Sequence, residues 1–401
     1  MASTCSIELQ AQPWHNRGMG FRTKQVHEGV TPDPVTGAIL TPIYQSTTFV
    51  QDSVDEYMGK GYSYSRGGNP TVRALEDKLT ALEDGVDTTA YASGMAATVS
   101  AFLALLGAGD HIVVANVVYG GTYRFVDRFL TKFGVEVSFV NTSDIDAVAA
   151  AIRANTKLVF TESPANPTLQ VTDLAAVSAV CNEHGILHVT DNTFLTPYFQ
   201  RPFELGADII IHSTTKFLDG HNSTLGGAVV VNDADLHERI AFARMSAGLV
   251  MSPMVAWLTL QGIKTLSERM DRQSANALAV AEYLQTHHKV EYVTYPGFPT
   301  HPQHELSSKQ ASGFGAMVCF EMNGGLEAGK RLMDSIGLWS LAENLGSVES
   351  LITHPVTMTH AAIPPEARMA AGITDGLVRL SVGLEDAEDL IDALDRALAQ
   401  V

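Results

Sequence analysis

The sequence predicts an α/β protein whose larger part is a mostly parallel β-sheet covered by helices on both faces. Two observations lead to this prediction. Short β-branched runs alternate with helical patterns between about residues 70 and 235, which is typical of such sheets. After about residue 235 the pattern changes to a long helical region followed by fewer strand-like runs. The 401 residues are also too many for one ordinary compact core, so we expect a second, smaller α/β domain.

The elements of the predicted larger domain follow one another in regular alternation. Strand-like runs cover 88–91, 111–115, 135–140, 157–160, 186–190, 208–212 and 227–231. Helical patterns cover 72–84, a small-residue stretch from 94, 123–132, 145–153 and 174–184. Ligands of parallel sheets bind beyond the carboxyl ends of the strands. Polar residues that follow these runs are therefore the first candidates for a functional site.

We divide the chain into an arm at residues 1–68, a large domain at 69–266 and a small domain at 267–401. The arm has no periodicity of its own, so we expect it to lie on another surface, such as a second subunit. Pro253 and Gly262 interrupt the helical region 235–286. The small domain then contains strand-like runs at 291–294, 316–320 and 377–381 and a closing helix at 385–398.

Composition narrows the classes of function. The formal charge of −18 disfavours nucleic acid or an anionic membrane as the main partner, because both require basic surface. The first residues resemble no signal peptide and no apolar run is long enough to span a bilayer, so we expect a cytoplasmic protein. Cys5, Cys181 and Cys319 are far apart and form no CxxC pair, which predicts neither a disulfide framework nor a metal site.

Two predicted strands end in residues suited to a charged cofactor. The run 208–212 leads through Ser213, two threonines and then Lys216. A lysine there, beside hydroxyls that could hold a phosphate, suits a Schiff base to a phosphorylated aldehyde. The preceding run ends at Asp191, and a carboxylate there could pair with a protonated ring nitrogen. Alone, Lys216 could be a solvated loop residue and Asp191 a helix cap.

A third feature is the segment Ser93-Gly94-Met95, in which a strand runs into small residues that open a helix. Backbone N–H groups at such a helix start can hold a phosphate, and small residues permit close approach. Close packing of the helix on the sheet would also explain the small residues.

In this order, the three features resemble the Cys/Met-metabolism family of pyridoxal-phosphate (PLP) enzymes over nearly the whole chain. The family includes cystathionine γ-synthase, cystathionine γ-lyase, methionine γ-lyase and the homoserine-ester sulfhydrylases. The resemblance rests on seven motifs: Tyr64-Ser-Arg-Gly-Gly-Asn-Pro-Thr71, Ser93-Gly-Met95, Val118-Tyr-Gly-Gly-Thr122, Glu162-Ser-Pro-Ala-Asn-Pro-Thr168, Asp191-Asn-Thr193, Ser213-Thr-Thr-Lys216 and Val378-Arg-Leu-Ser-Val-Gly-Leu-Glu385. It implies PLP fold type I (aspartate-aminotransferase-like) and pyridoxal 5'-phosphate as cofactor.

The resemblance also implies a role for each matching residue. Lys216 would hold the cofactor and move protons, and Tyr119 would stack on the ring as a second catalytic residue. Arg379 would bind the substrate α-carboxylate. The remaining cofactor-binding residues would be Ser93, Gly94, Met95, Asn166, Asp191, Thr193, Ser213 and Thr215, with Tyr64 and Arg66 reaching the phosphate from a neighbouring subunit. The family further implies a small-molecule amino-acid substrate and a homotetramer built as a dimer of dimers with shared active sites.

The position of the chain within the family depends on fewer residues. Gly121 stands where methionine γ-lyases usually carry cysteine. Arg124 and Glu343 fall where cystathionine-handling members place charges for the distal end of the substrate, although either residue alone could be a solvated surface charge. Asn344 is more similar to the sulfhydrylases.

We expect PLP-dependent γ-elimination on a four-carbon amino acid such as cystathionine, releasing α-ketobutyrate and ammonia. The alternatives are γ-replacement, as in cystathionine γ-synthase or an O-acyl-homoserine sulfhydrylase, then methionine γ-lyase or an aminotransferase. A non-catalytic PLP-fold protein is disfavoured, because Lys216, Asp191, Tyr119 and Arg379 are all present.

Overall fold

The computed structural model describes residues 18–361 and 364–401. The predictions made for Cys5 and for the first 17 residues lie outside the described residues. Cys181 and Cys319 are buried free thiols. Within the described ranges, no helix is both long enough and apolar enough to cross a bilayer.

A seven-stranded sheet forms the centre of the larger part of the molecule, in the order β1-β7-β6-β5-β4-β2-β3. Strands β3, β2, β4, β5 and β6 run parallel to one another, and β7 is antiparallel to both β6 and β1. The predicted mostly parallel sheet is therefore confirmed. The strands are β1 Asp87–Tyr91, β2 His111–Ala115, β3 Glu136–Val140, β4 Thr156–Glu162, β5 Leu187–Asp191, β6 Ile209–His212 and β7 Gly227–Val231.

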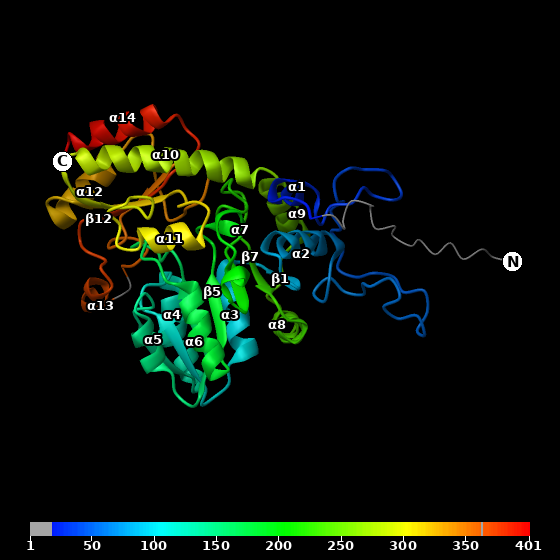
Figure 1. Cartoon of the computed structure of the whole chain (residues 1–401). Helices are drawn as coiled ribbons and strands as arrows, with labels where there is room; N and C mark the ends of the chain where they lie inside the picture. The colour runs from blue at the N-terminus through cyan, green and yellow to red at the C-terminus, as the bar shows by residue number, and fades with distance from the viewer. Residues whose placement is uncertain (1–17, 362–363) are drawn as a thin grey trace.

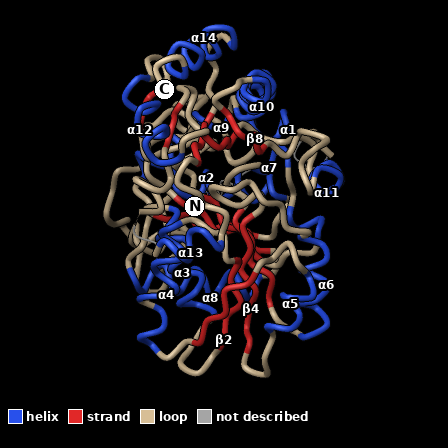
Figure 2. Tube along the Cα trace, turned by 90° about the vertical axis from the view of Figure 1, so that its left-hand side faces the viewer, coloured by secondary structure: helices blue, strands red, loops and turns tan. Residues whose placement is uncertain are grey.

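Helices cover both faces of this sheet because alternate strand residues point to opposite sides. Ile112 and Val114 pack in one apolar cluster with residues of α3, α4 and α8, whereas Val113 packs in another with residues of α5 and α6. Figure 2 shows the strands between these helices. The helices are α2 Pro70–Glu83, α3 Gly94–Leu105, α4 Gly120–Arg128, α5 Ile145–Ala151, α6 Leu174–His184, α7 Thr196–Phe199, α8 Ala234–Ala247 and α9 Pro253–Ile263, with short 3-10 turns at Leu130–Phe133 and Pro202–Leu205.

The second sheet has five strands in the order β10-β11-β12-β9-β8 and is mostly antiparallel. The longest helix that packs on this sheet is α10, which runs from near α9 across the sheet (Figure 1). The strands are β8 Val290–Thr294, β9 Met317–Met322, β10 Ser340–Leu341, β11 Leu351–Thr353 and β12 Leu377–Ser381. The helices are α10 Leu266–Thr286, α11 His304–Gln310, α12 Gly325–Ser335, α13 Pro365–Ala370 and α14 Ala387–Leu398.

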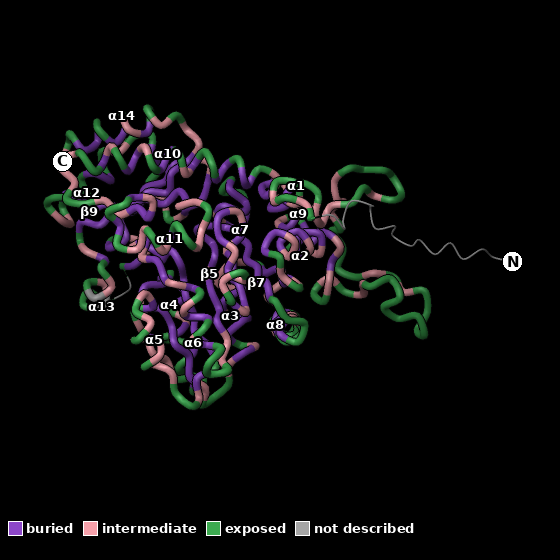
Figure 3. Tube along the Cα trace, in the orientation of Figure 1, coloured by how far each residue is buried: buried purple, intermediate pink, exposed green. Residues whose placement is uncertain are grey.

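The described part of the predicted arm contains one helix, α1 Phe21–His27, which was not predicted from the sequence. Its last turn is held by Lys78, whose buried ammonium donates to the carbonyls of Gln25 and Val26 at 2.7 and 3.3 Å. The loops between α1 and α2 project away from the body and are largely exposed (Figures 1 and 3). The arm and domain boundaries themselves remain predictions.

The structure differs from the predicted elements at several ends. The predicted helix 123–132 begins earlier, at Gly120, and gives way after Arg128 to a 3-10 turn. The helical region 235–286 is three helices, with Pro253 as the first residue of α9, the position where proline costs no hydrogen bond. The two short strands β10 and β11 and the helices α11, α12 and α13 were not predicted.

Candidate active site

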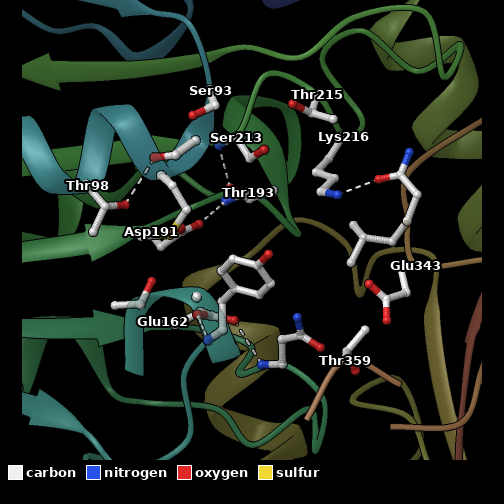
Figure 4. Close-up of a pocket in the computed structure, with 18 of the residues that line it drawn as sticks. Ser93, Thr98, Glu162, Asp191, Thr193, Ser213, Thr215, Lys216, Glu343 and Thr359 are labelled. Carbon is white, nitrogen blue, oxygen red and sulfur yellow. Dashed lines mark hydrogen bonds between the residues drawn. The ribbon is translucent and has the colours of Figure 1, made fainter. Parts of the chain in front are cut away.

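A pocket of about 420 Å³ lies where the carboxyl ends of β4, β5 and β6 meet the start of α3 and the second sheet. It brings together fourteen of the sixteen predicted site residues: Ser93, Gly94, Met95, Tyr119, Arg124, Asn166, Asp191, Thr193, Ser213, Thr215, Lys216, Glu343, Asn344 and Arg379. The strand ends converge as the parallel topology requires. Figure 4 shows the labelled side chains around this space.

Lys216 lies in the turn that follows β6, and its side chain reaches across the pocket (Figure 4). Its amine donates a hydrogen bond to the side-chain oxygen of Asn344. Burial, and then the nearby Arg379 guanidinium, lower the pKa of the Lys216 amine to about 8. Both effects favour the neutral amine, which is the nucleophilic form.

Asp191 ends β5, and its carboxylate accepts the Thr193 backbone N–H at 2.9 Å. The Thr193 hydroxyl in turn accepts the Ser213 N–H at 2.9 Å, which ties the strand end bearing Asp191 to the turn bearing Lys216. Burial raises the pKa of the Asp191 carboxyl. A cation placed beside Asp191 would offset this cost of desolvation.

The N-terminus of α3 faces the turn between β6 and Lys216. Ser93 is the N-cap and its hydroxyl accepts the Ala96 N–H at 3.0 Å. A side chain at Gly94 would lie 2.8 Å from the Ser213 Cβ atom, so only glycine allows this approach. The N–H groups of Gly94 and Met95 are among the first of the helix, where backbone donors have no intrahelical acceptor. Together with the Ser213 hydroxyl they form a site suited to a phosphate.

Arg379 is held at the opposite wall of the pocket, on β12, with only 2% of its surface exposed. One terminal nitrogen donates to the Asn166 side-chain oxygen at 2.7 Å, and the other donates to the Asn344 carbonyl at 3.2 Å and the Thr353 hydroxyl at 3.3 Å. Its Nε has no partner among the described residues. A buried guanidinium with an unused donor is suited to a carboxylate ligand.

Tyr119 stands at the start of α4 and lines the pocket. The residue is 43% exposed. A Cβ atom at Gly121 would lie 2.4 Å from the Tyr119 ring and 2.9 Å from the Met95 sulfur. A side chain at residue 121 would therefore push the ring from this position.

Arg124 and Glu343 both line the pocket from exposed positions, on α4 and on the segment between β10 and β11. Next to Glu343, the Asn344 amide donates to the Asn222 side-chain oxygen at 2.5 Å. Asn222 in turn donates to Ser347 at 2.8 Å and Glu349 at 3.0 Å. The oxygen of Asn344 that faces Lys216 is thus fixed by a chain of side chains.

Two predicted site residues, Tyr64 and Arg66, do not line the pocket of their own chain. Both are exposed, and the Arg66 guanidinium carbon lies 5.4 Å from the centre of the Tyr64 ring. Their predicted role across a subunit interface remains a prediction.

The pocket also contains residues for which the sequence suggested no role. Glu162 is the most notable, because it is a buried carboxyl at the end of β4, directly beside Asp191 in the strand register. Its position after an apolar strand was a usable signal, since Asp191 was found in the same way. The others include Thr98 on α3 and several residues of loops and turns, namely Phe194, Leu225, Leu345, Met358 and Thr359.

The residues present fit pyridoxal 5'-phosphate. Gly94, Met95 and Ser213 would hold the phosphate, Asp191 the ring nitrogen and Lys216 the aldehyde carbon. The Thr215 hydroxyl is already engaged, donating to the Gly226 carbonyl at 3.2 Å and accepting the Gly226 N–H at 3.0 Å.

Comparison with known proteins agrees with this geometry. A sequence model described as "Cys/Met metabolism PLP-dependent enzyme" matches residues 22–399. The chain is 46% identical to a cystathionine γ-lyase of Bacillus subtilis, over 96% of this chain and 100% of that one. It is equally 46% identical to a cystathionine γ-synthase of Mycobacterium tuberculosis, over 96% and 98%. The crystal structure of cystathionine γ-lyase from Lactobacillus plantarum complexed with L-serine superposes with a TM-score of 0.93, at 42% identity over 96% of this chain and 99% of that one.

Proposed function

The chain belongs to the Cys/Met-metabolism family of PLP-dependent enzymes, and we propose that it eliminates the γ-substituent of a four-carbon amino acid such as cystathionine. The reaction would consume water and release the substituent as a thiol, together with α-ketobutyrate and ammonia. The family, the fold type and the cofactor predicted from the sequence are confirmed. A γ-lyase and a γ-synthase are equally similar to this chain, at 46% identity each.

One observation supports cystathionine-like substrates above the alternatives. Arg124 and Glu343, which carry opposite charges, line the same pocket as Lys216 and Arg379. A substrate whose α-carboxylate pairs with Arg379 could therefore place a distal carboxylate near Arg124 and a distal ammonium near Glu343. Methionine has no such distal charges. An O-acyl-homoserine could use at most one of them.

Each of four pocket residues would have its own role in the γ-elimination. Bound pyridoxal phosphate supplies an electron-withdrawing ring that makes the substrate Cα–H acidic. Asp191 would keep the ring nitrogen protonated, and Arg379 would orient the substrate through its carboxylate. The Lys216 amine would take the Cα proton, pass it to the cofactor and, neutral again, take a Cβ proton. The Tyr119 phenol, which lines the same pocket, would donate a proton to the leaving sulfur.

The decisive experiment is a substrate panel read by α-ketobutyrate release, with and without an added thiol. Cystathionine, methionine, O-acetylhomoserine, O-succinylhomoserine, homocysteine and a cationic-tailed analogue should be compared. We expect cystathionine to give the highest kcat/KM. Replacement of Arg124 by Ala should raise KM for cystathionine at least about tenfold, the loss expected for a charge-assisted hydrogen bond, but leave KM for methionine unchanged. Suppression of ketobutyrate by thiol would instead indicate γ-replacement.

We further propose a cytoplasmic homotetramer in which Tyr64 and Arg66 complete the phosphate site of the neighbouring chain. The exposed arm supports this arrangement, because these two residues lie outside the pocket of their own chain. Sedimentation analysis of the purified enzyme tests the oligomer, and cell fractionation tests the location.

A further inference from the structure

Glu162 is a buried carboxyl group whose oxygens contact no cationic side chain within hydrogen-bonding distance among the described residues. The residue is 6% exposed at the end of β4. One oxygen accepts the backbone N–H of Tyr119 at 2.8 Å, and the other accepts the backbone N–H of Asn166 at 3.0 Å. A carboxylate is costly to bury in this way, so its retention requires an explanation.

The two backbone groups that Glu162 binds belong to different loops. Tyr119 follows β2 and begins α4, and Asn166 lies in the loop that follows β4. The Asn166 side chain then accepts a hydrogen bond from Arg379 at 2.7 Å. The Glu162 carboxylate therefore links the tyrosine on one wall of the pocket to the arginine on another through two backbone bonds and one side-chain bond.

We propose that Glu162 is a positioning residue, whose carboxylate fixes Tyr119 and, through Asn166, Arg379 relative to each other. This inference rests on the proposed function, in which Tyr119 and Arg379 hold the two ends of the reacting carbon chain. An ionised carboxylate can accept both N–H groups at once. A neutral acid has one oxygen committed to its own proton and holds one of the two N–H groups poorly.

The ionisation of Glu162 should therefore control this link. Burial, and then the charge of Asp191 on the adjacent strand, raise the pKa of the Glu162 carboxyl to about 8, against the opposing effect of the two N–H groups and of Arg379. The ionised form is lost as pH falls through the raised value. The two loops should then be held less firmly at neutral pH than at alkaline pH.

Hydrogen exchange of the wild-type holoenzyme, read by mass spectrometry, tests the link without any substitution. We expect the protection factors of peptides carrying the Tyr119 and Asn166 amides to rise as pH increases through about 8. Protection of a control peptide in β9, which lies outside the pocket, should stay constant. Constant protection at all three peptides would overturn the proposal.

The variant Glu162→Gln keeps the size of the side chain but replaces one acceptor oxygen with an NH₂ donor. We expect exchange at Tyr119 or Asn166 to accelerate about tenfold, the effect of losing one hydrogen bond, and to lose its pH dependence. KM should rise for substrates with an α-carboxylate and kcat should fall, while the visible cofactor band is retained. Glu321→Gln is the matched control, because Glu321 is a similarly buried carboxyl on β9 outside the pocket.

The outcomes separate this inference from the proposed function. If cystathionine is not cleaved but Glu162→Gln still accelerates hydrogen exchange at the Tyr119 and Asn166 amides, the positioning role stands and the substrate assignment is wrong. If cystathionine is cleaved and Glu162→Gln changes neither amide exchange nor KM, the positioning role is wrong. A variant that only unfolds at lower temperature, with unchanged KM and local exchange, also overturns it.

Discussion

The Lys216 amine is half-buried, and this should determine when it can react. Burial, and then Arg379, lower its pKa to about 8. Only the neutral amine attacks an aldehyde, and the neutral form dominates above the pKa. We therefore expect the rate at which cofactor-free protein takes up pyridoxal phosphate to rise with pH through about 8 and then level off. The growth of the visible absorbance band measures this rate.

The variant Arg379→Met serves as the matched comparison, since it removes the nearby cation and leaves a side chain of similar length. It should move the midpoint to higher pH. A wild-type midpoint close to the ordinary lysine value of about 10.4 would contradict the prediction.

A side chain at residue 121 should displace the Tyr119 ring from its place in this chain. In Gly121→Ala, the new Cβ atom would lie 2.4 Å from the Tyr119 ring, so the ring must move. We expect kcat to fall at least about tenfold, in line with the cost of displacing a catalytic group by about 1 Å. Steady-state kinetics on cystathionine measures the effect.

Gly337→Ala is the control, because a Cβ atom at residue 337 meets nothing within 4 Å. Equal activity of both variants would show that Tyr119 can adjust without loss.

At the residue scale, the sequence indicates which residues come together where position along a strand determines position in space. Asp191 and Lys216 each follow a buried strand, and parallel strands bring their ends together. Glu162 also ends a strand, but its partners are the backbone N–H groups of Tyr119, 43 residues before it, and Asn166, four residues after it. Every residue except proline has a backbone N–H group, so residue types do not show which N–H groups bind a carboxylate. The link between Glu162 and Tyr119 could therefore not be predicted from the sequence.

At the element scale, Arg269 on α10 should stabilise the turn that carries Lys216. Its buried guanidinium donates to the Phe217 carbonyl at 2.7 Å and the Gly262 carbonyl at 2.9 Å. Arg269→Met would leave both carbonyls without these donors, at about 1–3 kcal/mol for each unsatisfied group. We expect the free energy of unfolding to fall by about 2–4 kcal/mol and the affinity for pyridoxal phosphate to decrease.

Urea unfolding of the holoenzyme and cofactor titration of the cofactor-free protein measure these two effects. The neighbouring variant Arg272→Met is the control. Arg272 is exposed and approaches Asp386 only at 3.5 Å, so its loss should cost less than about 0.5 kcal/mol. Similar losses for both variants would argue against a specific role for Arg269.

Three of the elements that were not predicted, α1, β10 and β11, share a physical cause. α1 has seven residues and β10 and β11 have two and three, which is too short for a hydrophobic period to be seen. Such elements are stabilised by contacts with the rest of the protein. Lys78, for example, donates hydrogen bonds to the last turn of α1. The strands of the seven-stranded sheet were predicted because they are buried on both faces and read as apolar runs.

At the scale of the whole molecule, the order of strands and helices predicts which residues of one chain form the pocket. It does not predict which residues a second chain would add to that pocket. Fourteen predicted site residues gather in one pocket, whereas Tyr64 and Arg66 stay outside it. Nothing in the alternation of strands and helices distinguishes a residue that acts in its own chain from one that acts across an interface. The family resemblance supplied that expectation, and it needs a test on assembled subunits.

Mixing two inactive variants provides this test. In a hybrid of Arg66→Ala and Lys216→Ala chains, one site carries both defects and the other carries neither, if Arg66 serves the neighbouring pocket. Random reassembly should therefore restore up to about a quarter of wild-type activity, since half of the dimers are hybrids with one intact site each. The matched control mixes Asp191→Ala with Lys216→Ala. Asp191 and Lys216 line the same pocket of one chain, so no hybrid of these variants contains an intact site, and activity should stay absent. Recovery in neither mixture would show that Arg66 acts within its own chain or not at all.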